Sequence, residues 1–275
     1  MTKILSIVVT YYPSKKLLED NINAFIDFVD KVLIWENTPK EERDHYRFIF
    51  REKVEYCGDG INSISRALNY AWKYAKMNKF DYLLTMDQDS VWNNVEVFLN
   101  KTIFNVDAPF GIYGPCINEE IHQELFSQTE LITSGMLSPI SIIDKIGGYN
   151  EFFRIDGIDT WLCYKAKELD IVTYRVSGCV LNQHYGNLHK ERIGRIYVFH
   201  TLDYPPIRLY EIFKSYVLIL RRFHTSKRLK KQFFYELLVK HTIKVLLIEN
   251  KKYAKIKAIL SGIMDGLFYK NLKML

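Results

Sequence analysis

The sequence has few of the residues that interrupt regular structure, with 13 Gly and 7 Pro among 275 residues. Disordered chains are typically rich in such residues and poor in aromatic ones. Aromatic side chains are frequent here, with 19 Tyr and 17 Phe, so the composition argues against disorder. A chain of this length buries a sizeable core. It has room for one large domain or for one domain plus an appendage, and we favour the second.

Cysteines and long apolar runs are also scarce. The four cysteines are widely spaced and form neither a C-x-x-C pair nor a compact framework: Cys57, Cys116, Cys163 and Cys179. They predict reduced, buried thiols in a cytoplasmic protein. No stretch of 18 apolar residues is present, so we predict no membrane span. The opening string MTKILSIVVTYYP fits neither a signal peptide nor an anchor.

Acidic residues are rare late in the chain, whereas Lys and Arg are frequent between Lys214 and Lys273. The net charge of +6 suits nucleic acid, an anionic membrane surface or a phosphorylated ligand. These basic residues alternate with aliphatic ones and no nucleic-acid motif is present, so we expect no nucleic-acid partner. Basic and apolar helix faces together fit either peripheral membrane contact through 205–275 or a packed appendage with solvated cations.

The first ninety residues alternate apolar strands with helices. Strands are expected at 4–9, 31–35, 54–57 and 82–86, and helices at 15–29 and 64–75. This order predicts an α/β fold, with right-handed crossovers and a doubly wound, mainly parallel sheet. Ligands on such sheets gather at the carboxyl ends of strands, where Thr10, Glu36 and Asp87 fall.

The rest of the chain has a mixed region and then a helical one. We expect strands near 111–114 and 172–183, a turn at Gly147-Gly148, and a helix near 160–169. From about Pro205 the apolar spacing is helical alone. We therefore predict a domain over 1–204, with halves 1–92 and 93–204, and a helical extension over 205–275.

Two carboxylates follow the fourth expected strand, Asp87 and Asp89 in the string MDQDS. Carboxylate oxygens suit Mg²⁺ or Mn²⁺, which can also bridge the oxygens of a diphosphate. The alternative is that both residues only end the strand or cap the next helix, since Asp is favoured in both places. The Asp-x-Asp pair alone leaves both interpretations open.

Other strings accompany this pair in order along the chain. They are TYYP at 10–13, WENTP at 35–39, GINSISRALN at 60–69, TSG at 133–135, GGYNEFF at 147–153, IDGIDTWLCYKA at 155–166 and AILSGIMDGL at 258–267. Together they resemble the family 2 glycosyltransferases with the GT-A fold, especially the rhamnosyltransferase-like branch. The resemblance covers nearly the full chain, and the combination is far more specific than any one string.

The resemblance implies roles on the donor side. Thr10 and Tyr11 would frame the nucleotide base, and Glu36 stands where an Asp usually contacts the nucleoside. Asp87 would touch the ribose or the diphosphate, and Asp89 would bind a divalent cation, Mn²⁺ or Mg²⁺.

His184, at the end of an apolar strand, matches a His that relatives use as a second metal ligand, and imidazole is an acceptable ligand for Mn²⁺. A structural His is the equal alternative. The cations of the following loop could close over the diphosphate or be solvated: His189, Lys190, Arg192 and Arg195.

On the acceptor side the resemblance implies that Asp159 is the general base, with Ser134, Gly135, Asp156 and Trp161 near the acceptor. A carboxylate beside an aromatic ring at a helix start could have a raised pKa and the reach that a base needs. Asp159 could instead be the N-cap of a helix beginning near Thr160. Asp156 and Asp159 could also exchange roles.

Three departures from the family pattern put the donor identity in doubt. Glu36 replaces an Asp, Ser63 stands where Gly is common, and Trp161 with Lys165 replaces the acidic and Arg positions after the base. Lys165 cannot reproduce the two-pronged contacts of Arg.

The sequence thus predicts an inverting, metal-dependent hexosyltransferase. Its donor would be a nucleotide-diphosphate sugar carrying rhamnose or a similar hexose, and its acceptor a growing, lipid-linked bacterial surface glycan. The second hypothesis is a sugar-phosphate nucleotidyltransferase, although TYYPSKK is not the Gly-rich loop that such an enzyme would need. A catalytically dead GT-A fold that serves as a basic membrane-binding module is the third.

Overall fold

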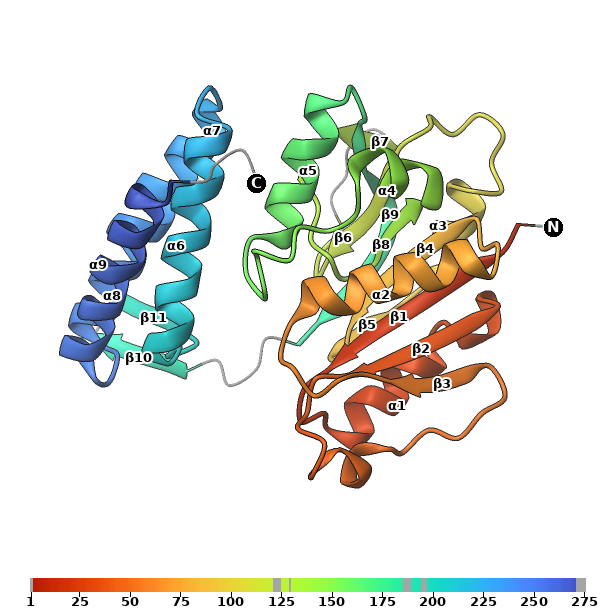
Figure 1. The fold of residues 1–275 in the computed structure, drawn as a ribbon, viewed down its shortest axis with the longest axis horizontal. Helices are drawn as coiled ribbons and strands as arrows, with labels where there is room; N and C mark the ends of the chain where they lie inside the picture. The colour runs from red at the N-terminus through yellow and green to blue at the C-terminus, as the bar shows by residue number, and fades with distance from the viewer. Residues whose placement is uncertain (1, 121–124, 129, 185–188, 194–196, 271–275) are drawn as a thin grey trace. The chain divides into compact units, whose positions relative to one another are not determined.

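The computed structural model describes residues 2–120, 125–128, 130–184, 189–193 and 197–270. The chain forms two compact units, Met1–His184 and Tyr185–Leu275 (Figure 1). The division therefore falls before the expected position 205. The reason is a hairpin of β10 (His189–Ile193) and β11 (Tyr197–Thr201), whose strands pair antiparallel with each other.

The first half of the main sheet matches the prediction closely. Its four strands are parallel: β1 (Ile4–Thr10), β2 (Lys31–Glu36), β3 (Val54–Cys57) and β4 (Tyr82–Asp87). The connecting helices are α1 (Lys15–Asn23) and α2 (Ile64–Met77). The helix expected over 15–29 ends at Asn23, and only a short 3₁₀ turn, Ile26–Phe28, follows it.

The second half of the sheet is mixed in direction. Its strands are β5 (Ser90–Trp92), β6 (Ile112–Ile117), β7 (Phe126–Gln128), β8 (Met136–Pro139) and β9 (Thr173–Gln183). The order is β3-β2-β1-β4-β8-β6-β9-β5, with β7 also paired to β9. β8 is antiparallel to both β4 and β6, and β9 is parallel to β6. The α/β prediction is confirmed, with parallel pairing concentrated in the first half of the sheet, β1 to β4.

Helices cover both faces of this sheet (Figure 1). In the second half these are α3 (Val95–Lys101), α4 (Ile140–Ile146) and α5 (Ile158–Glu168). Side chains alternate along a strand, so β1 supplies Ile4 and Val8 to one layer and Leu5 and Ile7 to the other. All four cysteines are free thiols; three are buried and Cys57 is half-buried.

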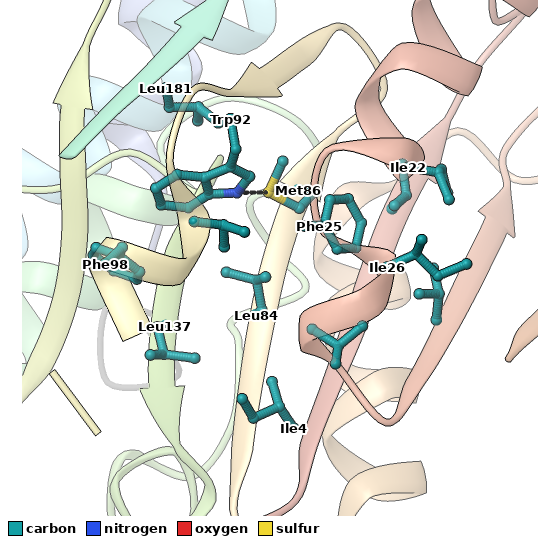
Figure 2. Close-up of a cluster of buried hydrophobic side chains, with 14 of the residues drawn as sticks. Ile4, Ile22, Phe25, Ile26, Leu84, Met86, Trp92, Phe98, Leu137 and Leu181 are labelled. Carbon is teal, nitrogen blue, oxygen red and sulfur yellow. Dashed lines mark hydrogen bonds between the residues drawn. The ribbon is translucent and has the colours of Figure 1, made fainter. Parts of the chain in front are cut away.

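Figure 2 shows the apolar layer in which the residue before the Asp-x-Asp turn is held. Met86 precedes that turn in the sequence and Trp92 follows it. Their side chains meet in the core, where Trp92 Nε1 donates to Met86 Sδ at 3.2 Å. Trp92 also packs against Phe98, with ring centroids 4.8 Å apart. Both side chains are almost fully buried. The turn between them is therefore anchored at each end by the core.

The second unit is helical after its hairpin. Its helices are α6 (Pro206–Arg222), α7 (Lys227–Lys231), the π-helix η3 (Gln232–His241), α8 (Thr242–Leu247) and α9 (Lys252–Phe268). Leu209, Phe213 and Val217 of α6 form the centre of its core. The hairpin is tied to this unit because Thr201 donates to the Glu249 carboxylate, which also accepts from Lys255 Nζ at 2.7 Å.

Close packing of α6 and α9 depends on two glycines. A Cβ on Gly262 would lie 2.4 Å from the carbonyl oxygen of Tyr210, and one on Gly266 would lie 2.8 Å from the side chain of Val217. Neither overlap can be relieved without separating the helices. The repeat Gly-x-x-x-Gly in the last helix is therefore a packing feature.

We expect Gly262→Leu to destabilise the second unit by about 1–3 kcal/mol, because overpacking at a backbone contact forces the helices apart. Hydrogen exchange should show lost amide protection in α6 and α9. Ser261→Leu is the matched control, since Ser261 is exposed. Equal protection in both variants would contradict the packing role of Gly262.

Candidate functional site

The carboxyl ends of three adjacent strands carry the predicted donor residues. Thr10 pairs in register with Glu36, and Val9 pairs with Asp87. The expectation that Thr10, Glu36 and Asp87 lie together at the carboxyl ends of neighbouring strands is therefore confirmed. Figure 1 shows these strands, β2, β1 and β4, side by side. Ligands bind at the carboxyl ends of the strands on open α/β sheets.

The loop after β1 is bonded to the Asp-x-Asp turn through its middle residue. Gln88 Oε1 accepts from the Tyr11 amide at 2.7 Å, and Gln88 Nε2 donates to the Tyr11 carbonyl at 3.1 Å. The next amide, that of Tyr12, donates to Thr38 Oγ1 at 2.9 Å. The ring of Tyr11 is 45% exposed and lies edge-on to that of Tyr12. The loop is thus fixed by its backbone while an aromatic face stays accessible.

Glu36 is buried and already has a cationic partner. Arg47 Nε lies 3.1 Å from Glu36 Oε1, and Arg47 Nη2 lies 2.8 Å from Glu36 Oε2. The Arg47 side chain is partly exposed, whereas that of Glu36 is not. The sequence predicted a nucleoside contact for Glu36 and missed Arg47. The paired guanidinium is the more accessible of the two groups.

Asp87 is held by hydrogen bonds from three separate elements. Its carboxylate Oδ2 accepts from Gln183 Nε2 at 3.1 Å, and its amide donates to Ser134 Oγ at 3.2 Å. Its carbonyl accepts from Asn21 Nδ2 of α1 at 2.7 Å. Asn21 also donates to the Ser90 carbonyl at 2.5 Å, across the turn. The bond from Gln183 sets the direction of the Asp87 carboxylate before any ligand arrives, and the bonds to Ser134 and Asn21 fix its backbone.

Neither carboxylate of the Asp-x-Asp turn caps a helix. Asp87 is the last residue of β4, and the next helix begins at Val95 with Asn94 as its N-cap. The alternative of helix capping is therefore wrong for both residues. Strand termination alone does not explain the three hydrogen bonds that orient Asp87.

His184 stands next to Asp89 because β9 pairs with β5. Ser90 is in register with Gln183, and the His184 amide donates to the Asp89 carbonyl at 3.0 Å. Burial raises the pKa of the Asp89 carboxyl, and the nearby charge of His184 partly opposes that shift. A cation would relieve the same desolvation.

A divalent cation fits this donor set only with help from a ligand. Among the residues that the structure describes, no three His, Cys, Asp or Glu side chains form a metal cluster. Mg²⁺ typically binds one or two carboxylates and completes its shell with substrate phosphates and water. The half-buried Asp89 carboxylate with the adjacent His184 meets that requirement, whereas an all-protein cage is not present in the described part.

We expect Gln183→Leu to weaken nucleotide binding by about tenfold, because it removes a charge-assisted hydrogen bond that orients the Asp87 carboxylate. Calorimetric titration with nucleoside diphosphates and Mn²⁺ measures this change. Asn182→Leu is the matched control, since its side chain bonds Asn93 and not the Asp-x-Asp turn. Unchanged affinity in Gln183→Leu would remove Gln183 from the site.

The second group of acidic residues surrounds the start of α5. Desolvation, together with the nearby charges of Asp156 and Glu130, raises the pKa of Asp159 to about 6, against the opposing effect of a hydrogen bond from the Thr160 amide. Glu130 is fixed by the Tyr164 hydroxyl at 2.6 Å. No motif in the sequence marks Glu130, which lies in a loop and acts on Asp159 through its charge.

Asp159 is not the N-cap of this helix. The helix begins at Ile158, and Gly157, with φ 90°, occupies the cap position. The N-cap alternative is therefore wrong, although Asp159 still accepts from the Thr160 amide at 2.7 Å. A half-buried carboxylate with a raised pKa in a first helical turn is suited to gain and lose a proton near neutral pH.

Two of the strings that carry the family resemblance bind each other. Asn69 of α2 donates to the Tyr149 carbonyl at 2.7 Å and accepts from its amide at 2.8 Å. A Cβ on Gly148 would lie 2.4 Å from the ring of Trp72, so this turn needs glycine. The Ile64 amide donates to the Arg154 carbonyl at 2.7 Å. The segment leading to Asp159 is thereby fixed against α2.

The remaining acceptor-side predictions lie deeper than an acceptor contact requires. Ser134 is fully buried beneath Asp87, and the Gly135 amide donates to the Thr85 carbonyl at 2.7 Å. Trp161 is also buried and lies against Phe153. Ser134 and Gly135 therefore hold the end of β4, through the Asp87 amide and the Thr85 carbonyl. The side chains of the basic loop, His189, Lys190, Arg192 and Arg195, fall outside the described residues.

Two departures from the family pattern have local explanations. Ser63 is the N-cap of α2 and its side chain accepts from the Arg66 amide at 3.5 Å. Its extended backbone does not require glycine. Lys165 pairs with Glu168 at 3.1 Å along α5. The Lys165 charge is therefore directed to its own helix.

No family model and no curated protein matches the chain. Solved structures match almost all of it. S. aureus TarS 1-349 in complex with UDP-GlcNAc has a TM-score of 0.56 at 16% identity, covering 96% of this chain and 81% of that one. Mannosyltransferase PcManGT from Pyrobaculum calidifontis, in complex with GDP-Man and Mn²⁺, has a TM-score of 0.61 at 10% identity, with 98% and 88% covered.

A third match is GalNAc-T7 with UDP, GalNAc and Mn²⁺, at a TM-score of 0.58 and 10% identity. It covers 97% of this chain and 56% of that one. All three are GT-A glycosyltransferases. At these identities the likeness establishes the fold, so the GT-A prediction is confirmed.

Proposed function

We propose that the chain transfers a sugar from a nucleotide-diphosphate sugar to an acceptor hydroxyl. The observation that carries this proposal is the pairing, in one GT-A unit, of a pre-oriented Asp-x-Asp turn with a carboxylate of raised pKa at the start of α5. The three matched proteins support it, because each was solved with a nucleotide or a nucleotide sugar.

On the sugar-donor side, the Tyr11 ring and Thr10 border the nucleotide base. Arg47, which is paired with Glu36, supplies hydrogen-bond donors near the nucleoside. Asp87 accepts from the ribose or faces the diphosphate. A divalent cation held by Asp89 and His184 would neutralise the negative charge of the leaving diphosphate. The burial that raises the pKa of Asp89 supports this placement.

On the acceptor side, Asp159 removes the proton from the acceptor hydroxyl as that oxygen attacks the anomeric carbon. The attack comes from the face opposite the diphosphate, so one displacement inverts the anomeric configuration. A base with a pKa near the working pH has both the free carboxylate and the driving force for this proton transfer. Burial keeps the pKa of Asp159 high, and the charges of Asp156 and Glu130 add to this effect.

The identities proposed for the sugar and the acceptor rest on the sequence resemblance. Rhamnose or a similar hexose is the proposed sugar, and a growing, lipid-linked bacterial surface glycan is the proposed acceptor. A nucleotidyltransferase is less consistent with the loop after β1, which has no glycine between Thr10 and Lys15.

The test is the anomeric configuration of the product. The protein is incubated with a panel of nucleotide sugars, Mn²⁺ and glycan acceptors, and the product linkage is determined by NMR. Inversion supports direct displacement with Asp159 as the base. Retention would exclude that mechanism, and formation of a new sugar nucleotide from a sugar phosphate would favour the nucleotidyltransferase.

A further inference from the structure

Charge is divided unevenly between the two compact units. Tyr185–Leu275 contains 19 of the 38 Lys and Arg residues but only 6 of the 32 Asp and Glu residues. This unit therefore has a net charge of +13, whereas Met1–His184 has a net charge of −7. The overall value of +6 conceals a strongly basic helical unit. Such a unit attracts anionic surfaces over several ångströms.

The last helix has apolar side chains on its outer face as well as its inner one. Residues at successive turns on the inner face of α9 are buried, among them Ile259, Gly262 and Gly266. The outer face has exposed apolar side chains at the same helical spacing: Tyr253, Leu260, Met264, Leu267 and Phe268. Leu260 is 57% exposed and Phe268 is 70% exposed. A helix in contact with water alone would have a polar outer face.

A second helical segment repeats this arrangement. Phe233 and Val245 point into the core of the unit. Along η3 and α8 the outward side chains are again large and apolar: Phe234, Tyr235, Val239, Ile243, Leu246 and Leu247. Both helical segments therefore expose large apolar side chains on the face that points away from the core. Exposed apolar surface of this extent marks an interaction site.

Cations lie among these apolar side chains. Lys230, Lys231, Lys252 and Lys257 are exposed on α7 and α9. Long lysine side chains can keep their ammonium groups at the level of lipid phosphates while their methylenes lie along apolar surface. Among the described residues, no helix is long and apolar enough to cross a bilayer. Apolar faces next to many cations instead suit helices that lie in a membrane interface.

We propose that the outer faces of η3, α8 and α9 bind the surface of an anionic lipid bilayer. Charge complementarity selects anionic headgroups, and the exposed aliphatic and aromatic side chains enter the acyl boundary. Nucleic acid would satisfy the cations and leave the apolar side chains in water. This proposal does not depend on the transfer reaction, because binding to a bilayer needs neither a donor nor an active base.

The test is vesicle flotation of the full chain. Vesicles of phosphatidylglycerol and phosphatidylcholine in equal parts should carry the protein upward, and vesicles of phosphatidylcholine alone should not. Added salt should weaken the binding. Leu260→Glu with Met264→Glu should lower the partition coefficient by about 100-fold or more, because two apolar side chains no longer enter the bilayer. Met77→Glu with Val106→Glu, at exposed apolar positions of the first unit, is the control and should bind normally.

A charge-reversal pair tests the electrostatic part without altering the apolar faces. Lys230→Glu with Lys257→Glu should lower binding to anionic vesicles by about 30-fold or more, at about fivefold for each lost cation. Lys73→Glu with Lys167→Glu, which makes the same change on exposed positions of the first unit, should leave binding unchanged.

Three outcomes would overturn the proposal. The first is a chain that stays unbound with anionic vesicles, which would mean that other parts of the protein cover these faces. The second is a dimer in ultracentrifugation that dissociates on Leu260→Glu with Met264→Glu while vesicles are ignored, which assigns the faces to a second copy. The third is salt-sensitive binding to duplex DNA without vesicle binding.

Discussion

Asp159→Asn should lower kcat by about 10²–10⁴-fold, the range that a positioned general base contributes. The substitution keeps the shape of the side chain and removes its capacity to accept the proton. Donor binding should change little, because we propose that Asp159 contacts the acceptor and not the donor. Initial rates and a nucleotide titration on the same preparation separate the two effects. Asp170→Asn is the control, since Asp170 is exposed beyond the other end of α5.

The pH dependence of transfer by the wild-type protein should have the same origin. Asp159 must be ionised to act, and its pKa is raised to about 6. We therefore expect kcat/KM to rise with pH through about 6 and to level off above it. A rise of kcat/KM near pH 4 instead would mean that Asp159 is not the base or is far more hydrated than the structure indicates.

The same shift predicts an effect on stability. Because the pKa of Asp159 rises from 3.8 to about 6 on folding, the folded state holds this proton more tightly than the unfolded state does. Its contribution to stability is present at low pH and is lost as pH rises through this interval. At pH 8 the ionised carboxylate therefore costs up to about 3 kcal/mol, which Asp159→Asn should recover. Urea unfolding at pH 5 and pH 8 measures the difference, and a less stable variant at pH 8 would contradict the desolvation of Asp159.

Asp89→Ala should abolish the metal-dependent part of nucleotide binding and lower kcat/KM by about 10²–10⁴-fold. The reason is that the cation loses its carboxylate ligand and the leaving diphosphate keeps its charge. The wild-type protein treated with a chelator should behave like the variant, and chelation should add nothing to Asp89→Ala.

Asp107→Ala is the matched control for this substitution, because Asp107 is an exposed carboxylate in a loop of the same unit. Its affinity for nucleotide with Mn²⁺ should equal that of the wild type. Full turnover in Asp89→Ala would refute the metal assignment and would place the cation, if one is used, on other ligands.

The parts of the fold that sequence predicted well are those in which one local pattern decides the outcome. The apolar runs of the first half gave β3 with its observed ends and the other parallel strands to within one residue. Parallel strand ends then had to share an edge, which placed Thr10, Glu36 and Asp87 together. The strands of the second half include antiparallel pairs, whose order in the sheet does not follow from their order in the sequence. Their order came only from the structure.

Site partners that are distant in sequence could not be predicted. Gln183 reaches Asp87 from 96 residues away, and Asn69 reaches Tyr149 across 80 residues. Arg47 follows Glu36 by only 11 positions, but in a segment without periodicity that could orient it. Glu130 influences the pKa of Asp159 through space alone. Hydrogen bonds of this kind depend on tertiary packing, which a single sequence does not specify.

The central claim is that the Asp-x-Asp turn at the end of β4 binds a nucleoside diphosphate together with a divalent cation. Calorimetric titration of the full chain with UDP, GDP and dTDP, each with and without Mn²⁺, tests it most directly. We predict that one nucleotide binds only when Mn²⁺ is present and that Asp89→Ala removes this binding. Binding of no nucleotide with any cation, or binding that is unchanged in Asp89→Ala, would contradict the claim.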